Sequence, residues 1–332
     1  MKIKGIIRKG EKIKMKKMIN TERIEGRIYQ HNLVKKTVQN QASKNFGKEF
    51  ISGNIEVAVD EEGLVIIPVH FTYVVETTNS GNKNATYTNL DRIINGGKTW
   101  VTDGKDDALK VRIDTALALN DFYTQDDRLV STKVNEGGFV TIISDLGPEN
   151  ERNTFTTDML ITNVTRVEAD PEKNIDKDYV VVKGAIFNFR NALLPVDFIV
   201  RNDEGMEYFE DLNASQNEPV FTKVWGRINC GSIANEVKEE TAFGEEAVRT
   251  FERKIREWII TGTSKVPYDF GDETVLTIVE VQKAMQDREL MLADTKKRSE
   301  EYRAQRDGGS STVAKPSTTI TTVTAAKGTF NF

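Results

Sequence analysis

Cationic and aromatic side chains alternate along several segments of the sequence. Arg27, Tyr29 and His31 are two residues apart, as are Lys223, Trp225 and Arg227. Residues two apart project from the same face of a β-strand. Such a face offers cations to phosphates and rings to unpaired bases, which are the two requirements for binding single-stranded nucleic acid. The spacing therefore predicts nucleic-acid contacts made from β-strands.

We expect two contact surfaces. Lys44, Phe46, Lys48 and Phe50 share a face if their segment is extended, and they extend the first surface. The first surface comprises Arg27, Tyr29, His31, Lys35, Lys36, Lys44, Phe46 and Lys48. The second comprises Lys183, Phe189, Arg190, Lys223, Trp225 and Arg227. The alternative is that Trp225 belongs to a core. That would turn Lys223 and Arg227 inward as well, which the cost of burying charge disfavours.

The overall charge at first argues against a polyanionic partner, because the chain carries a formal net charge of −5. The cations, however, are concentrated near the N-terminus, and the acids lie mainly in later segments. Local patches matter more than the total charge for phosphate binding. A solvated surface remains the alternative explanation of the basic N-terminal arm, residues 1–20.

The sequence offers little for catalysis. His31 and His70 are the only histidines, and His70 lies inside an apolar run. Gly96 to Thr99 resembles the end of a phosphate loop, but Arg92 stands where that motif needs glycine. The turn at 174–178 lacks the glycine and the closing glutamate of a calcium loop. We therefore expect a protein that is not an enzyme and has no metal or cofactor.

Cysteine content and hydropathy suggest a cytoplasmic protein. Cys230 is the single cysteine, so it can form no internal disulfide. No stretch approaches the roughly 20 apolar residues that span a bilayer, and no apolar segment of a secretory signal follows the basic N-terminus. A reducing cytoplasm, that of a host cell if the protein is viral, fits these features.

These candidate residues need strands to position them. Residues 21–147 read as a first β-rich domain, in which short β-branched and aromatic runs are separated by turns. Residues 154–233 repeat that pattern. Residues 236–306 are expected to be helical, because Val248, Phe251, Ile255 and Ile259 have helical spacing and a second helix is predicted from Thr274 to Arg306. Residues 307–332 are too polar to pack and are expected to form a disordered tail.

The order of these elements resembles that of oligonucleotide-binding (OB) folds. A long first strand (residues 24–38) leads into a hairpin (55–75), and a short helix (90–94) precedes the last strands. Residues 179–228, with Gly184, Phe198 and Trp225-Gly226-Arg227, look like the second barrel of phage or bacterial single-stranded DNA-binding proteins. The resemblance implies a mainly β fold of tandem OB-like barrels with C-terminal helices, a flexible N-terminal arm and a flexible tail. The tail ends in Phe332 but lacks the acidic run of the bacterial family.

Our first hypothesis is therefore sequence-tolerant binding of single-stranded DNA in phage DNA replication or recombination. RNA is an open alternative ligand, because OB barrels accept either polymer. Replication or recombination proteins are the expected partners of the tail, and self-association through the helices is another expectation. A different class of function also fits the pattern, namely a phage structural or assembly protein whose β-domains associate with one another.

Overall fold

The structure is a computed structural model, and it describes residues 17–43, 45–78, 80–170, 175–239, 247–270, 272 and 275–308. Side chains are described throughout these ranges except at residues 232–254 and 305–308. The expected flexible arm falls mostly, and the tail from residue 309 entirely, outside the described residues. Within them the chain is mainly β, as the sequence predicts, and a long helix follows the last strand.

Five strands close a first barrel. β1 pairs with β3 and β5, β3 pairs with β4, and β5 pairs with β6, all antiparallel. The ring closes where β4 and β6 pair in parallel. This closed five-stranded order, with a helix between the third and fourth strands, is that of an OB-fold barrel. The strands are β1 (Asn20–His31), β3 (Glu49–Ala58), β4 (Ile66–Val75), β5 (Lys110–Tyr123) and β6 (Leu129–Ile142).

Smaller elements decorate this barrel. The expected single strand over 24–38 is divided, because the chain leaves β1 at His31 and resumes as the edge strand β2, whose one partner among the described strands is β3. The helices α1 and α2 both lie between β4 and β5. These elements are β2 (Val34–Thr37), α1 (Ala85–Ile94) and α2 (Trp100–Asp103).

A second barrel repeats the same strand order. β7 pairs with β8 and β10, β8 pairs with β9, and β10 pairs with β11, again antiparallel. β9 and β11 close the ring in parallel, and α3 lies between β9 and β10. The elements are β7 (Asn153–Val167), β8 (Tyr179–Phe187), β9 (Leu193–Val200), α3 (Asp203–Asp211), β10 (Val220–Glu239) and β11 (Ala247–Thr263).

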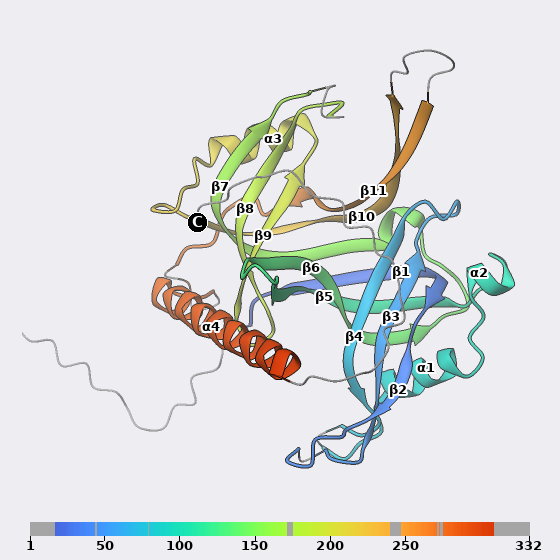
Figure 1. The fold of residues 1–332 in the computed structure, drawn as a ribbon. Helices are drawn as coiled ribbons and strands as arrows, with labels where there is room; N and C mark the ends of the chain where they lie inside the picture. The colour runs from blue at the N-terminus through green and yellow to red at the C-terminus, as the bar shows by residue number, and fades with distance from the viewer. Residues whose placement is uncertain are drawn as a thin grey trace, which may run out of the picture.

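The prediction of a helix around residues 248–259 is wrong, because this segment is strand β11. It pairs with β10 along its whole length, and the two strands extend beyond the barrel as a long hairpin (Figure 1). Helical spacing is a local signal, whereas β10 offers a complete edge of backbone donors and acceptors to a segment rich in β-branched residues. The later helix is confirmed as α4 (Ile278–Gly308).

The two barrels share one sheet and one core. β1 of the first barrel pairs with β7 of the second, which joins the strands into a single eleven-stranded sheet. The main hydrophobic cluster extends from Ile24 and Ile113 to Phe198 and Trp258. Whether the barrels fold as separate domains stays a prediction.

α4 braces the outside of both barrels, and it lies beside the β5–β6 hairpin (Figure 1). Val281 and Ala284 pack with Phe187 and Phe221 of the second barrel. Arg288 forms a buried ion pair with Asp121 at 3.0 Å. Among the described residues, no helix has the length and apolarity needed to cross a membrane.

Candidate nucleic-acid interface

The outer wall of the second barrel presents an open cationic and aromatic surface. On β10, Val224 and Ile228 point into the core, so that Lys223, Trp225 and Arg227 point outward. The exposed fraction of Trp225 is 40%, which excludes the alternative that it belongs to the core.

Threonines and one arginine of the neighbouring strands lie in register with these side chains. Trp225 is opposite Thr156, and Arg227 is opposite Thr154. Thr154 is in turn opposite Arg23 on β1. We call this set the Trp225 surface, and it consists of Thr21, Arg23, Thr154, Thr156, Lys223, Trp225, Arg227 and Thr261.

The indole of Trp225 lies against the backbone of Gly262 on β11. A Cβ added to Gly262 would lie 2.6 Å from the indole Cε2 and 2.8 Å from Cζ2, which is closer than real Cβ contacts come. Only glycine therefore allows this packing. The ring is held against a strand on the side of its Cε2 and Cζ2 atoms and is otherwise partly exposed, so it offers a planar ligand a ring of restricted mobility.

A shallow cavity of about 580 Å³ lies beside the ring. Thr154, Thr156, Trp225, Arg227 and Thr261 are among the residues that line it. The Arg227 guanidinium donates a hydrogen bond to the backbone carbonyl of Asn150 at 2.5 Å. Because its partner is a neutral carbonyl, the positive charge of Arg227 is not cancelled by this bond.

Lys223 has a different environment, because it lies opposite Asp158 on β7. The Asp158 carboxylate accepts hydrogen bonds from the backbone N–H of Ile19 at 2.7 Å and the Tyr268 hydroxyl at 2.9 Å. Burial raises the pKa of Asp158, while the nearby charge of Lys223 lowers it. Lys223 therefore contributes less uncompensated charge to the Trp225 surface than Arg227 does.

The outer face of β1 continues the Trp225 surface toward the first barrel. Ile24 and Ile28 are buried, and Arg23, Glu25, Arg27 and Tyr29 alternate with them on the outer side. A second cavity, of about 290 Å³, lies along this path, with Arg23, Arg152 and Thr154 in its lining. Thr154 lines both cavities, so they are neighbours.

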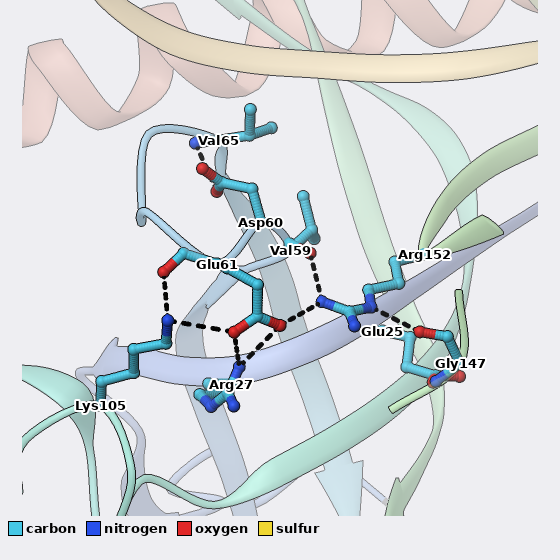
Figure 2. A network of polar contacts seen from close by, with 9 residues as sticks. All are labelled: Glu25, Arg27, Val59, Asp60, Glu61, Val65, Lys105, Gly147 and Arg152. Carbon is cyan, nitrogen blue, oxygen red and sulfur yellow. Dashed lines mark hydrogen bonds and ion pairs between the residues drawn. The ribbon is translucent and has the colours of Figure 1, made fainter. Parts of the chain in front are cut away.

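Arg27 belongs to a group of cations around one carboxylate, shown in Figure 2. Its Nη1 lies 3.0 Å from Glu61 Oε2, Lys105 Nζ lies 3.0 Å from the same oxygen, and Arg152 Nη1 lies 2.9 Å from Oε1. Hydrogen bonds from Arg152, Lys105 and Arg27 lower the pKa of Glu61 to about 2. We call Arg27, Glu61, Lys105 and Arg152 the Glu61 cluster.

Beyond the Glu61 cluster lies a pair of aromatic rings. The Tyr29 and Trp100 centroids are 6.1 Å apart, and Lys105 Nζ is 5.7 Å from the Trp100 centroid. The prediction that His31 shares a strand face with Arg27 is wrong, because a register shift between Ile28 and Gln30 sets His31 opposite the buried Ile55. His31 is half-buried, and burial lowers its pKa. A neutral imidazole can offer a hydrogen bond or a stacking face at neutral pH, but it offers no charge to a phosphate.

The remaining residues of the first predicted surface lie around β2 and the turn that follows it. Lys35 pairs with Asp91 of α1, whereas Lys36 is exposed. Phe46 and Lys48 are also exposed, but residues 45–47 form a turn. The expectation of an extended segment there is therefore wrong, and Lys44 lies outside the described residues.

Tyr73 forms an aromatic pair with Phe50 beside Lys36, and Tyr73 was not among the residues that the sequence predicted. Lys36 is opposite Phe50, and Phe50 is opposite Val75. The Phe50 and Tyr73 ring centroids are 4.7 Å apart. Alternation in β4 gave no signal for Tyr73, because Tyr73 shares its strand face with the buried Val69 and Phe71 and is nevertheless 43% exposed.

The other members of the second predicted surface lie apart from Trp225. Lys183 is on β8, which pairs with the edge of β7 opposite to β10. Phe189 and Arg190 lie in the turn after β8, where Phe189 is 66% exposed and the Arg190 guanidinium stands 5.0 Å from its ring centroid. The register therefore divides the predicted second surface into two regions.

Three comparisons place the chain among known proteins. A search of the curated proteins finds no match. One similar solved structure is a deletion mutant of the single-stranded DNA binding protein from Thermus aquaticus, with 11% identity and a TM-score of 0.45, covering 78% of this chain and 100% of that chain. A family model described as YorF matches residues 20–298. The chain belongs to the YorF family.

Proposed function

We propose that the protein binds single-stranded DNA along the Trp225 surface, with bases stacked on Trp225 and phosphates held by Arg227 and Arg23. The observation that supports this most strongly is the packing of the Trp225 indole on Gly262, with Arg227 beside it. A fixed ring with an accessible face stacks on any base, so binding of this kind is tolerant of sequence.

The threonines of the Trp225 surface suit the same ligand. Thr154, Thr156 and Thr261 line the cavity next to the ring, and hydroxyl groups donate hydrogen bonds to phosphate oxygens without reading sequence. Their β-branched side chains also favour the strands that carry them. The surface thus combines one stacking platform, cations and neutral donors on rigid strands.

Lys36, Phe50 and Tyr73, which we call the Lys36 region, form a proposed second contact with the DNA. Phe50 and Tyr73 form a ring pair beside an exposed lysine at the end of the first barrel. OB folds bind oligonucleotides on their second and third strands and at the loop after the first strand. Those elements correspond here to β3, β4 and the segment that contains β2.

A role in DNA replication or recombination, a phage context and a cytoplasmic location are parts of the same proposal. Recruitment of partner proteins through the tail and self-association stay predictions as well. The proposal is a binding role and not a catalytic one.

A titration of oligo-dT at low and high salt tests the proposal. We expect a gel shift at micromolar protein in low salt, which weakens steeply as salt rises because counterions are released from the phosphates. Absence of a shift in low salt would contradict the proposal. Competition with an RNA oligomer of the same length tells DNA preference from RNA preference.

A further inference from the structure

We propose that the Glu61 cluster is a phosphate-binding site that the chain fills with its own Glu61 carboxylate, so that a phosphate group binds there by displacing this side chain. For the phosphodiesters of single-stranded DNA, this site rests on the proposed function. Free pyrophosphate has the same chemistry and gives a test that does not depend on DNA.

The composition of the cluster is the first reason. Three cations, Arg27, Lys105 and Arg152, approach one carboxylate within 3.0 Å, which leaves a local excess of two positive charges. Glu25 does not cancel that excess, because its carboxylate binds Arg112 at 3.2 Å and the backbone N–H of Gly147. Two guanidinium groups around one point match the several acceptor oxygens of a phosphate better than the two of a carboxylate.

An unused donor is the second reason. Arg27 Nε is buried and makes no hydrogen bond within the described residues. A buried donor without a partner is costly, and the two oxygens of Glu61 are already shared among Arg27 Nη1, Lys105 and Arg152. Nε–H lies on the guanidinium edge opposite Nη1, so an anion that replaces Glu61 uses this donor when the Arg27 side chain turns its Nε–Nη2 edge toward the site.

The loop is built so that Glu61 can leave without the loop unfolding (Figure 2). The Asp60 carboxylate accepts hydrogen bonds from the backbone N–H groups of Leu64 and Val65 at 2.9 and 2.8 Å. Arg152 donates to the Val59 carbonyl, and Lys105 donates to the Glu61 carbonyl. These contacts involve the backbone or Asp60, so a rotation of the Glu61 side chain, which is 40% exposed, breaks none of them.

The position of the cluster fits a nucleotide strand that starts at Trp225. Arg23 and Arg27 are four residues apart on β1, which is roughly 14 Å at the rise of a strand. Arg23 and Arg227 are two strands apart, which is roughly 10 Å. A phosphate at Lys105 would also stand next to the Tyr29–Trp100 ring pair, so that the adjoining base meets an aromatic surface.

The test compares Glu61→Gln with Glu62→Gln, which removes the same charge from the exposed neighbouring residue. Isothermal titration with inorganic pyrophosphate in low salt is expected to show at least about fivefold tighter binding to Glu61→Gln than to Glu62→Gln, the factor that corresponds to about 1 kcal/mol. Equal affinities would overturn the proposal, whether or not the protein binds DNA.

Oligo-dT is the second arm, and it separates the two proposals. If the wild type binds oligo-dT, Glu61→Gln should bind more tightly than Glu62→Gln, with a salt slope steeper by about 0.7 for one added phosphate contact. Wild-type binding with no difference between the variants would show that DNA binds elsewhere and would overturn the DNA part of this proposal alone. Failure of the wild type to bind would contradict the proposed function, while the pyrophosphate result still decides whether the cluster is a phosphate site.

A measurement on the wild type covers the case in which Glu61→Gln does not fold. The side-chain Nε–H signals of Arg27 and Arg152 can be followed by NMR during titration with pyrophosphate. Displacement of Glu61 predicts that both signals shift together and saturate, and that Lys105→Gln weakens the titration. Signals that stay unchanged at saturating pyrophosphate would overturn the proposal.

Discussion

The Trp225 surface and the Glu61 cluster lie along the same outer wall, and both place a cation near an aromatic ring. They differ in the partner of the cation that lies nearest the ring, although Arg23 of the Trp225 surface also meets a carboxylate, that of Asp114, at 3.6 Å. Arg227 donates to a neutral carbonyl, whereas Arg27, Lys105 and Arg152 meet a carboxylate. A row of cations in a sequence thus says little about available charge until the partner of each cation is known.

The difference also concerns the rings. Trp225 lies against a glycine backbone and keeps an exposed fraction of 40%. Trp100 is half-buried and packs against Tyr29, Lys105 and Gly63. The Trp225 surface is therefore open to a ligand as it stands, and the Glu61 cluster becomes open only when a side chain moves.

Removal of the stacking ring gives the largest expected effect. Trp225→Ala should weaken oligo-dT binding by about 1–3 kcal/mol, the usual worth of one base–aromatic stack. Fluorescence anisotropy with a labelled oligomer measures it. Tyr302→Ala, which removes an exposed ring from α4, is the matched control and should bind like the wild type. Equal losses of oligo-dT affinity in the two variants would show that the Trp225 ring contributes no more to binding than an exposed ring elsewhere on the protein.

Tilting the ring should cost less than removing it. Gly262→Ala places a methyl group in the space of the indole, so the ring must move, and we expect oligo-dT affinity to fall by about 1 kcal/mol. The double variant Trp225→Ala/Gly262→Ala should bind no more weakly than Trp225→Ala alone. Additive losses would mean that Gly262 acts on binding by another route.

Loss of one cation should appear mainly as a change in salt dependence. Arg227→Gln should lower the slope of log affinity against log salt by about 0.7, as one phosphate contact to a single strand is lost. Arg298→Gln on α4, where Arg298 pairs with Asp294, should leave the slope unchanged. A slope that is the same in both variants would show that Arg227 contacts no phosphate.

The smallest expected effect concerns stability in acid. The pKa of Glu61 is lowered from 4.5 to about 2, so its ion pairs stabilise the folded state above about pH 4.5. This contribution is lost as the pH falls toward 2, and exposure limits it to about 1 kcal/mol. Urea unfolding should show that the wild type loses more stability than Glu61→Gln over this range. Parallel curves would mean that the ion pairs add nothing measurable.

The sequence was sufficient for the features that depend on local order. Alternation of Lys223, Trp225 and Arg227 with apolar neighbours predicted an outward face, and the structure places them on one. The OB-like character followed from strands, turns and a short helix in the right order. α4 corresponds to the helix that was predicted from Thr274 to Arg306.

Features that depend on long-range pairing could not be found in this way. Gly262 becomes important only because the register of β10 and β11 sets it opposite Trp225. Arg152 and Lys105 are distant from Glu61 in sequence and meet it only when the barrel closes. The same limit explains the error at residues 248–259, where pairing with β10 overrode a helical spacing.

Photocrosslinking of a bromodeoxyuridine-substituted oligo-dT tests most directly where the strand lies. After irradiation and digestion, mass spectrometry identifies the crosslinked side chains. Our account predicts a principal crosslink at Trp225, which disappears in Trp225→Ala. Crosslinks confined to Phe46, Phe50 and Tyr73, with none at Trp225, would contradict it.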